Sequence, residues 1–249
     1  MRLLLLGVFF SVAISGYTQS NQNQQIEIWG GVSVFQYFGD IGGSADEKNL
    51  FGLKDISLKS NRPGFNFGVN YWVSDKLLIQ GSNLIGIVTQ TDKGSRNSIR
   101  NFSFSTIADE ISVQGSYFFI KENKNINYQN ISLRGGKKNL KRIISVYGYA
   151  GAGALLFKVV PKDNLDGSPR FNGSKSVTLA IPVGLGVRLA YTQKMLFAFE
   201  FGARLIMTDY LDGFSSKDSK YNDTYYVMNF KAVYRISTKV QRNRINAGY

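Results

Sequence analysis

Few residues in this chain have the spacing that acid–base chemistry requires. Asp209 and Asp212, in the segment TDYLDG, could in principle act as a general acid and a general base. Asp and Gly are also ordinary turn residues, so we interpret this pair as turn chemistry at the end of a strand. Asp40, Asp46 and Glu47 lack the spacing of a calcium-binding loop. We therefore predict no catalytic residue and no metal site.

The chain contains no histidine and no cysteine. A serine or aspartate nucleophile usually needs a histidine base, so its absence removes the phospholipase, omptin-protease, lipid A palmitoyltransferase and lipid A deacylase families. The glycines from Gly151 to Gly153 do not follow a strand and open a helix, so they are not a phosphate-binding turn. We predict that the protein is not an enzyme, binds no cofactor and has no small-molecule substrate.

Charged side chains recur inside otherwise apolar segments of the sequence. They are Glu27, Glu110, Arg188, Glu200, Arg204, Lys231 and Arg235. If side chains alternate in direction, these three acids and four bases point to one side of a sheet and can pair. The interior of a small eight-stranded barrel is only wide enough for side chains to fill. We therefore expect a salt-bridged plug rather than an ion pathway, and no open pore.

Period-two alternation identifies the elements that carry these charges. Near the C-terminus, one face carries Tyr226, Met228, Phe230, Ala232, Tyr234 and Ile236. Upstream, one face carries Phe197, Phe199, Phe201, Ala203, Leu205 and Met207, with Glu200 and Arg204 on the other. A large apolar face of this kind must meet lipid or a second sheet. In a membrane, Phe201→Arg should cost about 2–4 kcal/mol, and Gly202→Ser on the opposite face should be milder.

Eight segments show this pattern and define the predicted fold. They are 26–38, 64–73, 76–90, 107–120, 143–158, 175–191, 195–209 and 223–237. Each is long enough for a tilted strand to cross the hydrocarbon layer, which takes about 9–11 residues. Tight connections at 74–75 and 192–194 alternate with long polar ones. We predict an all-β, eight-stranded antiparallel transmembrane β-barrel of the outer-membrane type. Alternation alone leaves a soluble β-sandwich open.

Two places depart from the strand pattern. The segment 143–158 contains YGYAGAGALL, which is mostly glycine and alanine, and is expected to be the weakest strand. Its small residues should leave room for neighbouring lumen side chains. Pro182 lies within a strand-like run and cannot donate a hydrogen bond to a ladder, so a local bulge is expected there.

The first residues have the pattern of an export signal. Arg2 precedes an apolar run from Leu3 to Ile14, which is too short to span a bilayer as a helix. We predict a cleaved signal peptide at 1–20 and one barrel domain at 21–249, located in the outer membrane with its lipids as immediate partners.

The chain carries a formal charge of +13, and residues 121–142 hold seven basic residues against the single acid Glu122, a net charge of +6. The predicted topology needs only a short periplasmic turn there. The candidate docking residues are Arg134, Lys137, Lys138, Lys141 and Arg142. This segment either meets lipid headgroups or docks an acidic protein face. The chain has no nucleic-acid-binding motif, so no nucleic-acid partner is predicted.

Five motifs occur in an order that resembles the PorG-like family of Bacteroidetes, small outer-membrane barrels of the type IX secretion system. They are YFGDIGG (Tyr37–Gly43), RNFSF (Arg100–Phe104), YGYAGAGALLF (Tyr147–Phe157), IPVGLGVR (Ile181–Arg188) and FEFGARLIMTDYLDG (Phe199–Gly213). The resemblance spans about residues 28–236, and TDYLDG preceded by FGxR is its most specific part.

This resemblance implies a non-enzymatic component that anchors the periplasmic ring of the secretion machinery, a lipoprotein and its partner protein, to the outer membrane. The rival interpretation is a stand-alone barrel with no secretion role. Such a barrel would pass small solutes or bind surface ligands through its loops.

Overall fold

The computed structural model describes the strands and part of their connections. The described residues are 26–38, 41, 61–93, 98–122, 143–169, 171, 173, 175–192, 194–208, 210–214 and 223–236. All of them belong to one unit of the chain, Gln25–Ser237. The predicted signal peptide and the docking residues Arg134, Lys137, Lys138, Lys141 and Arg142 lie outside the described residues. In the described ranges, no helix has the length and apolar character to cross a membrane.

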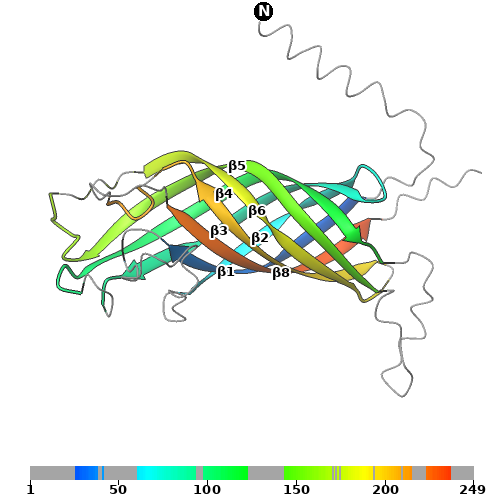
Figure 1. Cartoon of the computed structure of the whole chain (residues 1–249), viewed down its shortest axis with the longest axis horizontal. Coiled ribbons are helices and arrows are strands. Elements are labelled where there is room, and N and C mark those ends of the chain that lie inside the picture. Colours follow the sequence, from blue (N-terminus) through cyan, green and yellow to red (C-terminus); the bar gives the residue numbers. More distant parts are fainter. Residues whose placement is uncertain are drawn as a thin grey trace, which may run out of the picture. The chain divides into compact units, whose positions relative to one another are not determined.

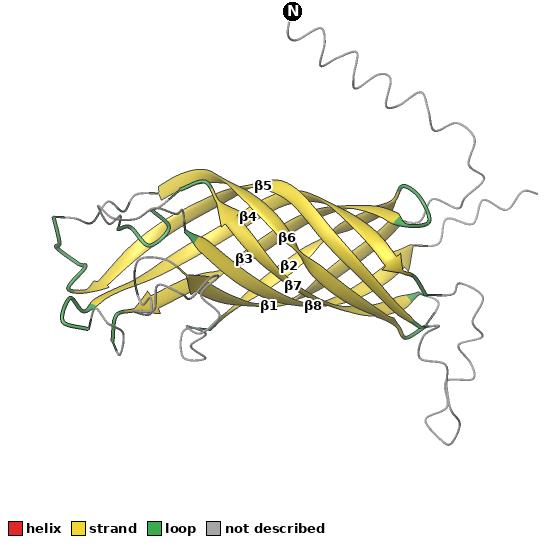
Figure 2. Cartoon of the chain, viewed as in Figure 1, coloured by secondary structure: helices red, strands yellow, loops and turns green. Residues whose placement is uncertain are grey.

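Eight antiparallel strands form one closed barrel (Figure 1). They are β1 (Ile26–Phe38), β2 (Arg62–Trp72), β3 (Leu77–Thr91), β4 (Phe102–Ile120), β5 (Ile144–Asp163), β6 (Lys175–Ala190), β7 (Met195–Ile206) and β8 (Thr224–Ile236). Each strand pairs with the next along the chain, and β8 pairs with β1 to close the sheet. The strands run obliquely around a continuous wall (Figure 2). The predicted all-β, eight-stranded antiparallel barrel is confirmed.

The connections divide the barrel into a turn end and a loop end. At the turn end, residues 73–76 and 191–194 form tight turns, where the Val73 and Tyr191 N–H groups each donate to a carbonyl at 3.0 Å. Strand β1 begins and β8 ends at this same end. Short turns face the periplasm in bacterial barrels, so the turn end is the periplasmic end.

Strands β4 and β5 are longer than the sequence pattern predicts. Strand β4 begins at Phe102 rather than at 107, and β5 continues to Asp163 rather than to 158. The two strands pair across this extra length. Strand β5, expected to be the weakest, is the longest of the eight at 20 residues. Its small residues pair with β4 throughout, whereas Gly151 and Ala152 have no partner on β6.

The prediction of a bulge at Pro182 is wrong. Pairing between β5 and β6 lapses beside this residue, but the pairs on either side keep the same register. A proline lacks the N–H that a ladder bond needs, yet it inserts no extra residue. The register instead shifts between β4 and β5, at Phe118/Ile120.

The wall has an apolar outer face and a largely polar inner face. The outward side chains of Phe65, Leu185 and Phe201 are 68%, 63% and 40% exposed. On the inward face beside Phe201, Glu200 and Arg204 are each 2% exposed. An apolar surface of this extent is unfavourable in water, and a closed barrel can present it to lipid because its strands pair in an unbroken ring with no free sheet edge. The fold is that of a small eight-stranded outer-membrane barrel.

Candidate functional site

The seven charged residues predicted to face the lumen all lie inside the barrel. Those residues, all buried, are Glu27, Glu110, Arg188, Glu200, Arg204, Lys231 and Arg235. Strands β1, β4, β6, β7 and β8 each contribute, because every second residue of a strand points to the same side. The charges form three layers between the turn end and the loop end.

The layer nearest the turn end is centred on Glu27 of β1. Its Oε2 accepts hydrogen bonds from the Arg188 guanidinium at 2.5 Å and from the Asn70 amide at 3.1 Å. Its Oε1 accepts hydrogen bonds from the Arg235 guanidinium at 3.1 Å and from the Trp72 indole at 3.0 Å. One buried carboxylate therefore pairs with two guanidinium groups, and each of its oxygens accepts two bonds.

Sequence reasoning missed a fourth buried acid, Glu122, which is 3% exposed just beyond the end of β4. Its carboxylate forms an ion pair with Arg235 and accepts a hydrogen bond from the Ser145 hydroxyl. Burial acts to raise the pKa of Glu122, but the Arg235 charge and the Ser145 bond outweigh it and hold the pKa below its ordinary value.

With Glu122 included, the three charged layers hold four acids and four bases. From the sequence, we predicted three acids and four bases facing the lumen. Alternation gave no usable signal for Glu122, because Phe119 and Ile120 are both exposed and the even-numbered inward series of β4 ends at Phe118. The place of Glu122 in a connection, among basic residues, concealed it.

The middle layer is centred on Glu200 of β7. The Lys231 ammonium lies 2.6 Å from Glu200 Oε2. The Tyr147 hydroxyl and the Asn229 amide donate hydrogen bonds to the same carboxylate at 2.7 Å and 3.2 Å. The Lys231 ammonium also lies 3.9 Å from the centroid of the Trp29 ring, a cation–π contact. Both charges of this layer are therefore fully engaged with neighbouring side chains.

The third layer joins Glu110 of β4 to Arg204 of β7, with 3.3 Å between Nε and Oε2. The Tyr225 hydroxyl donates to Glu110 at 2.7 Å, and Arg204 donates to the Tyr149 hydroxyl at 3.3 Å. A Cβ at Gly202 would lie 2.2 Å from the Tyr149 hydroxyl oxygen and 2.5 Å from a backbone carbonyl oxygen. A side chain at Gly202 therefore requires Tyr149 or the wall to shift, which argues against the expectation that Gly202→Ser is milder than Phe201→Arg.

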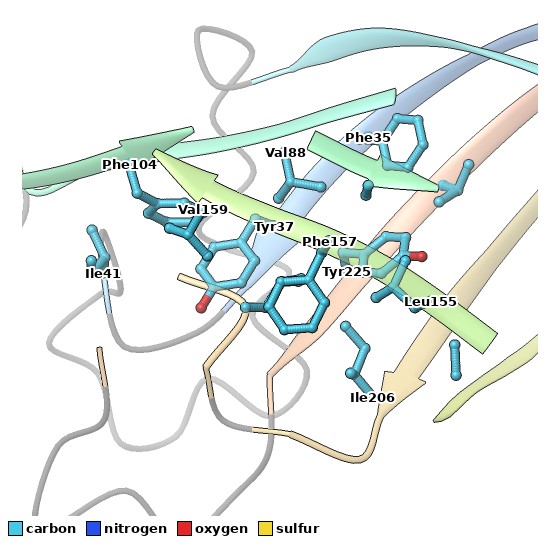
Figure 3. Close-up of a cluster of buried hydrophobic side chains, with 14 of the residues drawn as sticks. Phe35, Tyr37, Ile41, Val88, Phe104, Leu155, Phe157, Val159, Ile206 and Tyr225 are labelled. Carbon is cyan, nitrogen blue, oxygen red and sulfur yellow. The ribbon is translucent and has the colours of Figure 1, made fainter. Parts of the chain in front are cut away.

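Apolar side chains fill the loop end of the barrel (Figure 3). The aromatic rings gathered there include Phe35, Tyr37, Phe104, Phe157 and Tyr225. Residues 211–214 turn inward against this cluster, with Leu211 and Phe214 0% and 2% exposed. The Thr106 hydroxyl donates to the Leu211 carbonyl at 2.7 Å and ties the turn to β4. Residues of the motif TDYLDG therefore help to close the loop end of the barrel.

Asp212, one of the two acids considered for catalysis, lies in this inward turn. Its Oδ1 accepts the Phe214 N–H at 2.9 Å, a bond typical of a turn-forming aspartate. Asp223 accepts the Tyr37 hydroxyl at 2.5 Å and the Leu211 N–H at 2.9 Å, which fixes the turn in place. Outside the described residues lie Asp209, Asp40, Asp46 and Glu47. Within the described ranges, no three acidic, histidine or cysteine side chains gather where a metal ion could bind.

A small pocket lies between the first two charged layers. This cavity, of about 10 Å³, lies among Gln80, Tyr147, Arg188, Glu200 and Lys231. That volume is room for about one water molecule. Such an interior can brace the wall and block passage. Its acids and bases are engaged with one another rather than presented to a substrate.

A family model described as a domain of unknown function, DUF6089, matches residues 4–237. This chain belongs to the DUF6089 family. The match covers all eight strands of the DUF6089 barrel. A search of curated proteins finds no match to it.

Solved structures similar to the DUF6089 barrel include three bacterial proteins. Ail of Yersinia pestis, in complex with the heparin analogue sucrose octasulfate, is 13% identical and aligns over 86% of this chain and 100% of that one, with a TM-score of 0.46. The outer membrane protein OprG from Pseudomonas aeruginosa is 10% identical over 86% and 97%, with a TM-score of 0.47. Neisserial surface protein A is 11% identical over 88% and 100%, with a TM-score of 0.36. At these scores, the fold of the DUF6089 barrel rests on its own strand pairing and apolar outer face.

Proposed function

We propose that this DUF6089 protein is a sealed, non-enzymatic membrane anchor that works through the segments at its two ends. The filled lumen is the observation that carries the proposal. Three charged layers of four acids and four bases lie in the interior, and the aromatic cluster around Tyr225 occupies the loop end. An eight-stranded barrel filled in this way leaves no path for a solute. Its activity therefore lies in what its surfaces bind.

The finer part of the proposal is that the turn end docks the periplasmic ring of a type IX secretion system. The order of the five motifs supports it through the resemblance to PorG-like barrels. The basic stretch 121–142, with its net charge of +6, supports it through the attraction expected for an acidic partner. Both flanks of this stretch are anchored: Glu122 pairs with Arg235, and the Ile143 carbonyl accepts the Ala190 N–H at 2.9 Å.

The test of docking is a multiple substitution in the basic stretch. The variant changes Arg134, Lys137, Lys138, Lys141 and Arg142 to Ser. Ring lipoprotein and its partner protein are then recovered with the tagged barrel in mild detergent over a range of salt. Recovery should fall, while barrel assembly, measured by heat-modifiable gel migration, should not change. The matched control changes Lys76 and Lys194, exposed in the short turns of the same end, to Ser.

Undiminished ring recovery by the five-residue variant at every salt concentration would remove the stretch from the docking surface. An equal loss in the control would assign the effect to the general charge of the turn end.

The alternative is a stand-alone barrel that binds surface ligands at its loop end. The extension of β4 and β5 beyond the start of β6 favours it, because that extension adds surface where loops face outside. In co-purification, a docking barrel should bring down ring proteins and a stand-alone barrel should not. Negligible conductance in planar bilayers is expected for both. Large, stable channels would overturn the sealed-anchor proposal and favour solute passage.

A further inference from the structure

At the loop end of the barrel, strands β4 and β5 extend beyond the start of β6. Pairing between β5 and β6 begins at Lys158↔Lys175, whereas β5 stays paired with β4 as far as Asp163. Alternate residues of this extra length point outward. On β5 the outward residues are Lys158, Val160 and Lys162, all exposed. Two lysines therefore lie on the outer surface of the wall, at the loop end.

Lys158 lies at the upper edge of the apolar band. The preceding outward residue on β5 is Leu156, 43% exposed, and the residue paired with Lys158 on β4 is Ile107, 52% exposed. Further out, the surface is mixed: Val160 is 40% exposed, and Thr91 and Ser103 share a hydrogen bond of 2.7 Å. A lysine at this level can lay its stem along the apolar surface and hold its ammonium among lipid headgroups.

Neither lysine has an ion-pair partner within 4.0 Å in the part of the chain that the structure describes, although Asp163 lies close enough to Lys162 to interact with its charge. Asp163 is also engaged by another lysine at 3.1 Å. Asp109, an outward acid on β4, accepts a hydrogen bond from Asn83 on β3 at 2.7 Å, on the side away from β5. The patch is therefore cationic and borders lipid directly.

We propose that Lys158 and Lys162 bind the phosphate groups of a glycolipid in the outer leaflet of the membrane. Four residues of strand separate them, about 13 Å, which suits a headgroup with two phosphates. The acyl chains of such a lipid would lie against Leu156 and Ile107, a contact that a free phosphate ion cannot make. This site goes beyond the anchoring function and does not depend on it.

Lipid A, a diphosphorylated glycolipid, is the probe for the test. Its binding to the full chain in mild detergent is measured by titration and by native mass spectrometry of the retained lipid. Changing Lys158 and Lys162 together to Ser should weaken binding about 25-fold, because a lysine beside an anionic lipid surface contributes roughly fivefold. The control changes Lys76 and Lys194 to Ser and should bind as the wild type does. Heat-modifiable migration should be unchanged in both variants because all four side chains are exposed.

Four outcomes would overturn the proposal. The first is equal binding by the wild type and by the variant that lacks Lys158 and Lys162. The second is an equal loss in the control, which would mean that any exposed lysine suffices. The third is displacement of lipid A by millimolar inorganic phosphate, which would make this a site for free phosphate. Dephosphorylated lipid A should fail to compete, and effective competition would likewise contradict phosphate recognition.

Discussion

Replacing Glu27 with glutamine tests whether paired charges hold the lumen together. The change keeps the size of the side chain and one accepting oxygen but removes the charge. Arg235 retains an acidic partner, Glu122. Arg188, which is 2% exposed, pairs with Glu27 among the described residues and would lose that partner. Glu27→Gln therefore leaves one buried guanidinium uncompensated.

Removing one member of a buried ion pair costs about 3–5 kcal/mol. We expect the lower end, about 3 kcal/mol, because the glutamine oxygen can still accept the Trp72 indole hydrogen bond. The Arg188 guanidinium also lies 5.8 Å from the Trp72 ring centroid and 5.6 Å from that of Phe118, and these contacts survive. Adding Arg188→Gln should recover most of the loss, since replacing a whole buried pair is often neutral.

The assay is urea unfolding in phospholipid vesicles, followed by tryptophan fluorescence. The chain has 2 tryptophans, and both lie inside the barrel, Trp29 at 6% and Trp72 at 7% exposure. Their emission therefore reports on the lumen. The reasoning would be refuted if Glu27→Gln lost less than about 0.5 kcal/mol, the range of an ordinary surface substitution. A double variant with Arg188→Gln that is no more stable than the single variant would refute it as well.

Three further substitutions test the wall and the turn end. Phe201→Arg places a charge against lipid and should cost about 2–4 kcal/mol of unfolding free energy in vesicles; with Phe201→Leu as control, a tolerated arginine would invert the inward and outward assignment. Gly202→Ser should be comparably severe, about 3 kcal/mol, through overpacking, and heat-modifiable migration like that of the wild type would contradict the clash. Burial raises the pKa of Glu122 but Arg235 lowers it more, so this pair contributes stability that is complete above the unfolded pKa of about 4.3 and is lost as the pH falls through the folded value. Glu122→Gln should flatten the acid side of the stability–pH profile, and an unchanged slope would show that the carboxylate does not contribute.

Period-two alternation predicts most of the wall, because every second residue of a strand contacts lipid and must be apolar. The strand predicted at 26–38 coincides with β1, and the one at 175–191 ends one residue beyond β6. A slip of one residue would turn a whole apolar face inward, so the pattern is strict wherever the wall meets lipid. Beyond Ile107 the outward residues of β4 are serines. The alternation of apolar and polar residues is lost in this part of β4. The start of the strand at Phe102 could therefore not be predicted from the sequence pattern.

The partners of the lumen charges could not be predicted in the same way. Alternation places Glu27 on the inner face, but its partners Arg188 and Arg235 come from β6 and β8. Which charges meet depends on the stagger of the strands and on the width of the closed barrel, and neither appears in one strand's sequence. Gly202 gives the same lesson. A glycine in the sequence suggests that a small side chain would be tolerated there. Only the structure shows that the Tyr149 hydroxyl occupies the space beside Gly202.

The ion pairs of Arg235 connect the closed lumen to the proposed docking segment. This one guanidinium bonds Glu27, which completes the lowest charged layer, and Glu122, the last described residue before the basic stretch. If a partner pulled on that stretch, these bonds would connect Glu122 through Arg235 to Glu27 of β1, and through Glu27 to Arg188 of β6. A barrel with an open lumen would lack this bracing at its turn end. Under the proposed anchoring function, the filled interior would brace the turn end against such a pull.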